Sequence, residues 1–262
     1  MAPFVKIDGL TFAYPGTDSR TAVIDDISLV LAPGHFYGVI GPNGCGKTTL
    51  LDLMMGQLTP TKGSVQYQGR DLASIPMSVR AREMALVPQV YNINFPFTAQ
   101  EIVTMGRYPH LPRFAAPGEK DHSIVQEVMQ STDTLRLAHR SIERLSGGER
   151  QRVVFARALA QKTDALFLDE ATANLDVNHA LALLKLAAAK VHNGGTVVSV
   201  FQEINLAAMF CDRLILMEKG QVFAHGKKET ILTDQHLKQL FDVECQVERN
   251  DFNDHLQVTF KA

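Results

Sequence analysis

Apolar residues near the start of the chain follow two patterns. They alternate with polar residues or form short runs at 5–8, 27–31 and 36–40, and these patterns predict strands. Residues 49–55 instead carry apolar side chains at helical spacing, and Gly56 follows them as expected at a helix end. The first part of the chain is therefore expected to fold as strands, then a loop and a helix.

The middle of the chain has a helical pattern. Residues from about 92 to 160 follow a loop rich in proline and aromatic residues, and Ile124, Val125, Val128 and Met129 are spaced for one helix face. We interpret this region as an inserted helical lobe.

After the lobe, strand-like runs return. Residues 165–168 are continuously apolar and residues 196–200 are largely so, and a Leu- and Ala-rich helix is expected between them at about 177–192. This order is typical of parallel strands joined by crossover helices. From residue 229 the tail is expected to form a helix followed by short strands, and the pattern assigns it no role.

Composition narrows the class of protein. The chain has 262 residues, 45% of them hydrophobic and 21% charged, which fits one main core with a smaller lobe. A formal net charge of -2 gives no general basic surface, so nucleic acid is not expected as a partner. The chain has no apolar run of about 18 residues and no signal-peptide pattern, so a cytoplasmic protein is expected. Cys45, Cys211 and Cys245 lack the spacing of a disulfide framework or a zinc site.

A phosphate-binding motif lies between the expected strand at 36–40 and the helix that follows. The motif has the form G-x-x-x-x-G-K-[ST], in which a glycine-rich backbone faces phosphate oxygens, Lys47 supplies a cation and Thr48 can bind Mg²⁺. ATP or a related nucleotide with Mg²⁺ is thus the expected ligand. Cys45 is interpreted as a small filler of the loop with no redox role. The residues expected to contact the nucleotide are Gly41, Pro42, Asn43, Gly44, Cys45, Gly46, Lys47, Thr48 and Thr49.

Two adjacent carboxylates follow the apolar run at 165–168. Successive strand residues face opposite sides, so Asp169 and Glu170 cannot share one task. Asp169 suits the Mg²⁺ shell, while Glu170 can orient and deprotonate the attacking water. Without a phosphate loop elsewhere in the chain, this pair would be interpreted as a solvated strand end.

Residues 145–152, Leu-Ser-Gly-Gly-Glu-Arg-Gln-Arg, resemble the signature motif of ATP-binding cassette (ABC) proteins. Ser146, Gly147 and Gly148 precede an expected helix at 152–160 and offer a second anion-binding helix end. The resemblance implies a homodimer that holds each ATP between the phosphate loop of one subunit and the signature motif of the other.

The resemblance extends from about residue 4 to about 226 and implies an α/β fold. We expect a P-loop NTPase core with a mainly parallel sheet, an N-terminal antiparallel β subdomain and an inserted α-helical subdomain. The chain is then a single domain over residues 1–262. Its expected parts are a nucleotide-binding core at about 1–91 and 161–228, a helical subdomain at about 92–160 and a C-terminal extension at 229–262.

The resemblance also gives roles to single residues. Tyr14 is similar to the aromatic residue that stacks on adenine, and Gln89 to the glutamine that contacts the metal and the attacking water. Residues 174–176 resemble the segment that crosses the dimer interface, with Asp176 sensing the opposite site. Gln202 lies where the family has its switch histidine and is expected to contact the γ-phosphate.

A second departure is smaller: Ala171 replaces a usual proline, which should only loosen a turn.

Residues 96–110 resemble the corresponding segment of importers for iron-siderophores, haem and cobalamin. This implies a peripheral protein on the cytoplasmic face of the bacterial inner membrane that acts with separate permease subunits and, indirectly, a substrate-binding protein. Phe95, Phe97, Met105 and Tyr108 would supply apolar anchors for the permease. Other metal chelates and oxyanions such as molybdate remain open as substrates. So do a soluble ABC-type ATPase of translation or DNA repair and a weakly hydrolysing regulator.

Overall fold

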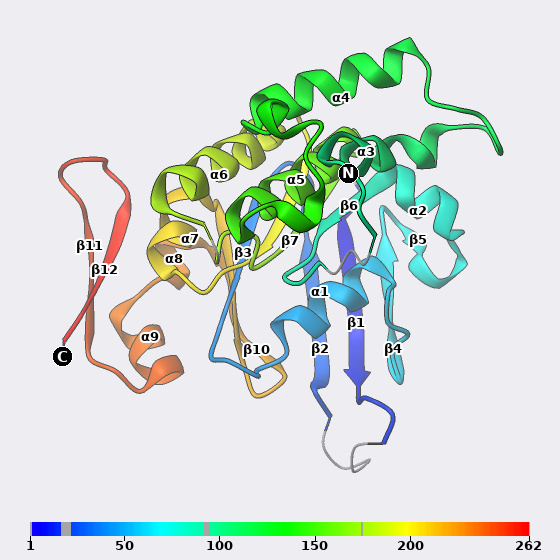
Figure 1. Ribbon diagram of the computed structural model, residues 1–262. Helices are drawn as coiled ribbons and strands as arrows, with labels where there is room; N and C mark the ends of the chain where they lie inside the picture. Colours follow the sequence, from blue (N-terminus) through cyan, green and yellow to red (C-terminus); the bar gives the residue numbers. More distant parts are fainter. Residues whose placement is uncertain (1, 17–21, 92–94, 174, 262) are drawn as a thin grey trace. The chain divides into compact units, whose positions relative to one another are not determined.

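The computed structural model describes residues 2–16, 22–91, 95–173 and 175–261 (Figure 1). The chain divides into two units by the proximity of its Cα atoms. Unit 1 comprises Met1–Ile75 and Thr196–Ala262, and unit 2 is the stretch 76–195 between them. This division leaves the expected subdomain boundaries near residues 92, 160 and 228 as predictions.

The N-terminal strands of unit 1 form an antiparallel sheet. Strand β1 (Val5–Phe12) lies between β2 (Ile24–Leu31) and β4 (Lys62–Tyr67), and the short β5 (Arg70–Asp71) pairs with β4. Buried and exposed residues alternate in β2, as expected for a sheet with one face toward a core. The predicted strands at 5–8 and 27–31 are confirmed, and both extend beyond those residues.

Unit 1 also contains parallel strands that are buried on both faces. Strand β3 (Phe36–Ile40) lies between β8 (Thr196–Val200) and β9 (Arg213–Glu218) and is parallel to both, while β10 (Gln221–Lys227) is antiparallel to β9. Every residue of β3 and β8 is buried, which explains why both strands are largely apolar. Helix α1 (Lys47–Met55) follows β3 and ends at Gly56, confirming the predicted helix.

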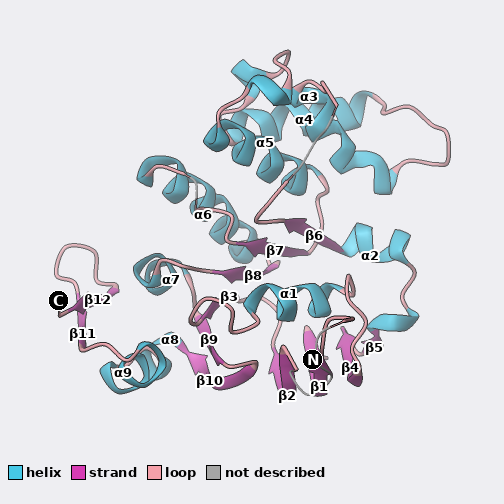
Figure 2. Cartoon of the chain, turned by 60° about the horizontal axis from the view of Figure 1, so that its bottom comes forward, coloured by secondary structure: helices cyan, strands magenta, loops and turns pink. Residues whose placement is uncertain are grey.

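The C-terminal part of unit 1 contains short helices and a hairpin. Strands β11 (Cys245–Arg249) and β12 (Leu256–Phe260) form a two-stranded antiparallel sheet, and α9 (Asp234–Phe241) precedes them (Figure 2). The predicted order of a helix and then short strands is confirmed. The elements of unit 1 not yet given are η1 (Leu72–Ser74), α7 (Ile204–Phe210) and α8 (Lys228–Ile231).

Unit 2 combines a parallel pair of strands with several helices. Strand β6 (Met84–Val87) is parallel to β7 (Ala165–Asp169), and α6 (Val177–His192) has the bounds that its pattern predicts. Helix α5 (Gly147–Ala160) begins five residues earlier than expected, because Ser146 caps it. The other elements are α2 (Met77–Glu83), α3 (Ala99–Thr104), η2 (Met105–His110), α4 (Glu119–Ser131), η3 (Leu135–Leu137) and η4 (Ile142–Arg144).

The helices of unit 2 share one apolar core. Val125, Val128 and Met129 of α4 pack with residues of α3 and α5 in a single buried cluster. These three residues lie on the helix face that their spacing predicts. No helix in the described part of the chain combines the length and the hydropathy that a bilayer crossing needs.

Candidate functional site: a nucleotide-binding cassette

Glycines determine the shape of the loop between β3 and α1. Gly44 and Gly46 have φ of +77° and +100°, in the left-handed region that favours glycine. A Cβ atom at Gly41 would lie 2.2 Å from the backbone oxygen of Met217, and one at Gly46 would lie 2.8 Å from that of Val23. Larger residues at these positions would therefore disrupt the loop.

The loop and the helix after it provide positive charge. Lys47 is 7% exposed, and its Nζ donates hydrogen bonds to the backbone oxygens of Gly41 and Pro42 at 2.8 and 3.0 Å. Among the described residues no side chain caps the start of α1, and its first turn has no acidic residue. The positive end of the helix dipole is therefore available to an anion.

Tyr14 and Thr49, two further residues expected to contact the nucleotide, lie next to each other. The Tyr14 hydroxyl is 3.2 Å from Oγ1 of Thr49 in α1, and the Tyr14 ring meets the Phe12 ring edge-on at 5.0 Å between centroids. Tyr14 is 41% exposed, so its ring can still accept a stacked base. Cys45 is 5% exposed, and burial raises the pKa of its thiol, which agrees with a filler role.

Gln202 follows the strand next to the phosphate loop. Val39 of β3 is in register with Val200 of β8, and the backbone N–H of Phe201 donates to the oxygen of Val39 at 3.0 Å. Phe201 is 2% exposed, whereas Gln202 is exposed. Because parallel strands end at one edge of a sheet, the Gln202 turn and the phosphate loop start from the same edge.

In unit 2 the same principle brings Gln89 and Glu170 together. Val87 of β6 is in register with Leu168 of β7, and each functional residue lies two positions further along. Nε2 of Gln89 donates to Oε2 of Glu170 at 2.5 Å. Glu170 has φ of +47° and is partly exposed, while Asp169 is 5% exposed. The two carboxylates therefore have different surroundings, as their separate expected roles require.

The signature segment forms a reciprocal helix cap. Oγ of Ser146 accepts from the N–H of Glu149 at 3.3 Å, and Oε2 of Glu149 accepts from the N–H of Ser146 at 3.0 Å. The bond from the Ser146 N–H is the main reason that the pKa of Glu149 is lowered. The start of α5 thus has its own carboxylate, unlike the start of α1.

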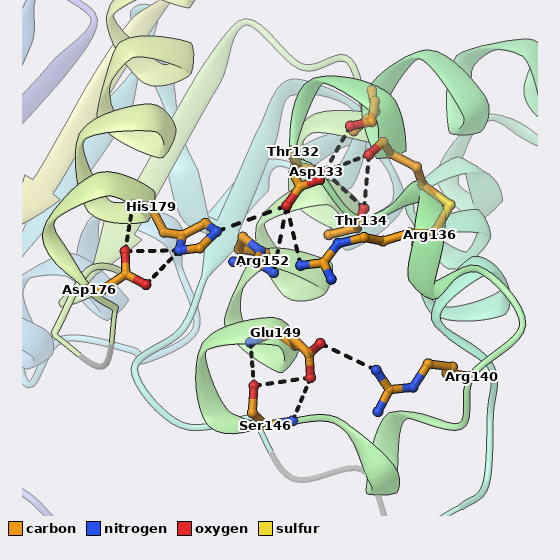
Figure 3. Close-up of polar contacts among 12 residues, drawn as sticks. Thr132, Asp133, Thr134, Arg136, Arg140, Ser146, Glu149, Arg152, Asp176 and His179 are labelled. Carbon is orange, nitrogen blue, oxygen red and sulfur yellow. Dashed lines mark hydrogen bonds and ion pairs between the residues drawn. The ribbon is translucent and has the colours of Figure 1, made fainter.

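A cavity of about 420 Å³ lies in front of this cap. Its lining includes Ser146 and Gly148 as well as Asp176, and Figure 3 shows Ser146 and Asp176 on separate segments of the chain. The structure therefore places the signature segment and the expected interface segment around one space within unit 2. The cavity is lined by Arg136, Ser146, Gly148, Glu149, Arg152, Leu175, Asp176 and His179.

Charged side chains connect the walls of this cavity (Figure 3). Asp176 caps α6 by accepting from the N–H of His179 at 2.9 Å, and this bond is the main cause of the lowered pKa of Asp176. Oδ2 of Asp133 is 3.4 Å from Nη2 of Arg136 and 4.0 Å from both Nη2 of Arg152 and Nε2 of His179. The cavity therefore combines the guanidinium groups of Arg136 and Arg152 with the carboxylates of Glu149 and Asp176.

The sequence interpretation did not assign roles to the basic residues of this cavity. The three-residue spacing of Asp176 and His179 at a helix start could have indicated their contact. Arg152 is the last residue of the signature motif at 145–152, whereas nothing in the hydrophobic pattern distinguishes Arg136 from a surface residue. Asn174, in the expected interface segment, lies outside the described residues.

The expected magnesium ligands are divided between the two units. Thr48 belongs to unit 1, and Gln89 and Asp169 belong to unit 2. Their hydroxyl, amide and carboxylate oxygens are ligand types that Mg²⁺ prefers. Within the described ranges, no group of three or more His, Cys, Asp or Glu residues could hold a metal ion.

Comparisons of the sequence with a family model and with known proteins agree on one protein family. The ABC transporter family model matches residues 24–173. The chain is 38% identical over 242 residues to the cobalamin import ATP-binding protein BtuD of Halobacterium salinarum, covering 91% of this chain and 60% of that protein. It is also 38% identical over 238 residues to the hemin import ATP-binding protein HmuV of Pseudomonas entomophila, covering 89% of this chain and 92% of that one.

Solved structures agree with the sequence comparison. A metal-chelate type ABC transporter in an inward-facing conformation superposes with a TM-score of 0.83 at 27% identity, covering 100% of this chain and 98% of the other. A dimeric ATP-binding cassette in a post-hydrolysis state with ADP and Pi gives 0.77 at 28% identity, covering 85% and 98%.

The chain belongs to the ABC transporter family and has the α/β fold of its ATP-binding cassettes. It resembles import ATP-binding proteins for cobalamin and hemin, and it spans about 60% of the length of the BtuD relative.

Proposed function

We propose that the chain is the ATP-hydrolysing subunit of an importer for a metal chelate such as an iron-siderophore, haem or cobalamin. The phosphate loop supports the ATPase activity, because Gly41 and Gly46 admit no side chain and Lys47 and the start of α1 present positive charge. The similarity to cobalamin and hemin import proteins supports the import of a metal chelate. Other chelates and oxyanions such as molybdate are the alternative substrates.

Hydrolysis of ATP requires an activated water and stabilisation of charge on the γ-phosphate. Glu170 is the general base that orients and deprotonates the water, and Gln89 holds one oxygen of its carboxylate through the 2.5 Å bond. Lys47 leaves its loop carbonyls to contact the β- and γ-phosphates, and Gln202 contacts the γ-phosphate by its amide. Tyr14 stacks on the base. Bound Mg²⁺, held by Thr48, Gln89 and Asp169, would neutralise phosphate charge.

The second proposed element is a homodimer. The cavity in front of Ser146 is lined by the guanidinium groups of Arg136 and Arg152, although Glu149 neutralises part of the α5 dipole. A triphosphate held by a partner subunit would supply the negative charge that the guanidinium groups of Arg136 and Arg152 favour. A solved cassette at 28% identity forms a dimer, which supports this arrangement.

The third element is attachment to a permease at the cytoplasmic face of the inner membrane. Phe95, Phe97 and Tyr108 are 65%, 36% and 55% exposed, so their apolar surface is available to a partner. Met105 instead packs partly against the core of unit 2. Tyr108 is therefore a cleaner position than Met105 for testing the contact.

The proposal is tested with Glu170→Gln. This variant keeps the phosphate loop but lacks the base, so it should bind Mg-ATP, accumulate as a dimer in size-exclusion chromatography and release almost no phosphate. The ATPase assignment is contradicted if the variant stays monomeric with saturating Mg-ATP and hydrolyses at the wild-type rate. Phosphate release with and without permease, in vesicles loaded with each candidate substrate, then separates an importer motor from a weakly hydrolysing regulator.

A further inference from the structure

The C-terminal hairpin contacts helix α7 through an unusual pair of hydrogen bonds. Oδ1 of Asn205 accepts from the backbone N–H of Val258 at 2.7 Å, and Nδ2 of Asn205 donates to the backbone oxygen of Val258 at 3.2 Å. A side-chain amide thus pairs with both backbone groups of one residue, as a neighbouring strand would. Strand β12 lies beside α7 in unit 1 (Figure 2).

The hairpin is itself anchored on its other side. Oδ1 of Asp234 in α9 accepts from the N–H of Val247 in β11 at 2.6 Å. The Val258 side chain is 3% exposed, although most of the hairpin faces solvent. The Asn205 amide therefore joins α7 to a segment that is fixed by α9 and by the burial of Val258.

Helix α7 needs such support. It has seven residues, fewer than a helix needs to be stable alone in water. Among the described residues no side chain caps its start at Glu203. Its stability comes from the burial of Ile204, Ala207 and Ala208 on one face and from the Asn205 bonds on another.

Gln202 lies between the two attachment points of this segment. On one side Phe201 is fixed by its buried ring and by its bond to Val39 of β3. On the other side Asn205 in the first turn of α7 is held by Val258. The backbone that carries Gln202 is therefore restrained both before and after this residue.

We propose that Asn205 is a positioning residue: by binding the backbone of Val258 it fixes the first turn of α7 and thereby the direction of Gln202. This gives the C-terminal hairpin a role in ATP hydrolysis although it does not contribute to the phosphate loop. The inference rests on the proposed contact of Gln202 with the γ-phosphate.

The test is a double-mutant cycle measured by single-turnover hydrolysis with the full-length protein. Asn205→Ala should lower the rate about fivefold, the equivalent of one net hydrogen bond of about 1 kcal/mol, with nucleotide affinity unchanged. If Asn205 acts through Gln202, adding Asn205→Ala to Gln202→Ala should cause no further loss. Gln257→Ala is the matched control, because this exposed neighbour in β12 contacts Asn250 of the same hairpin.

Each outcome has a separate meaning. A Gln202→Ala rate equal to that of the wild type removes the proposed role of Gln202 itself. If Gln202→Ala is slow, the inference is overturned by a wild-type rate in Asn205→Ala or by a fivefold further loss in the double variant.

Discussion

Arg107 offers the sharpest test of how the Gly-Arg-Tyr-Pro-His segment works. The resemblance placed this whole segment against a permease, but Arg107 is only 6% exposed. Its Nε donates to Oδ1 of Asp121 at 2.9 Å, and its Nη1 donates to the backbone oxygen of Ala160 at 2.7 Å. Arg107 therefore fixes η2 to the start of α4 and the end of α5, and Tyr108 is the neighbour that faces outward.

Replacing Arg107 with Met should destabilise the protein by about 3 kcal/mol, the low end for breaking a buried ion pair. The low end applies because Asp121 keeps a hydrogen bond from the N–H of Gly118 at 3.1 Å. For a chain of this size that loss corresponds to a fall in Tm of about 6–12 °C. Tyr108→Ala removes an exposed ring and should change Tm little, by about 2 °C or less.

Thermal unfolding followed by circular dichroism measures both variants, and permease-stimulated ATP hydrolysis is measured beside it. The hydrogen bond from Arg107 holds the pKa of Asp121 below its usual value. The pair therefore contributes its full stability at pH values above the pKa of Asp in the unfolded chain, and this stability is lost as the pH falls through the lowered pKa of the folded protein. The difference in Tm between wild type and Arg107→Met should therefore narrow from about pH 7 to about pH 3. The reasoning is refuted if Arg107→Met shifts Tm no more than Tyr108→Ala, or if the difference widens in acid.

Three further outcomes are expected. Lys47→Ala should weaken ATP binding itself, because an ammonium facing the phosphates is lost, and equilibrium titration with labelled ATP would show an unchanged affinity if this is wrong. Gln202→His should raise single-turnover hydrolysis about tenfold if a charge-assisted bond adds about 1.4 kcal/mol, and a slower histidine variant would contradict this account. Nη1 of Arg157 is 2.5 Å from the Tyr91 hydroxyl, and its guanidinium carbon lies 4.4 Å from the Tyr91 ring centre. Tyr91→Leu should thus lower Tm more than Tyr91→Phe, which keeps the ring contact with Arg157, and a larger fall in Tm for Tyr91→Phe in thermal unfolding would contradict this.

Much of the fold follows from local patterns. Strands β3 and β8 were predictable because burial on both faces favours runs that are largely apolar. The bounds of α6 were predictable because residues 177–192 are rich in Leu and Ala, and in the structure Asp176 caps the start of this helix. The predicted start of α5 at residue 152 was five residues too far along the chain, because Gly147 and Gly148 have low helix propensity. The reciprocal cap of Ser146 and Glu149 outweighs this low propensity.

The candidate site was less predictable where contacts are distant in sequence. The phosphate loop could be found because its chemistry requires consecutive residues. The Asn205–Val258 bonds join residues 53 positions apart, and neither type has a pattern that indicates the other. Arg107 shows the same limit: its motif pointed to a surface contact, but its partners Asp121 and Ala160 come from two other elements.

The position of β3 between β8 and β9 has a consequence for synthesis of the protein. Both neighbours of β3 follow residue 195, so its five buried residues have no strand to pair with while the intervening residues are being made. At roughly 5–20 residues per second, a ribosome needs about 10–35 s to pass from the end of β3 to the end of β9. During this time β3, which is fully buried in the finished fold, has no neighbouring strand in the nascent chain, and the phosphate loop follows this unpaired strand. The N-terminal nucleotide motif therefore becomes functional only when most of the protein has been translated.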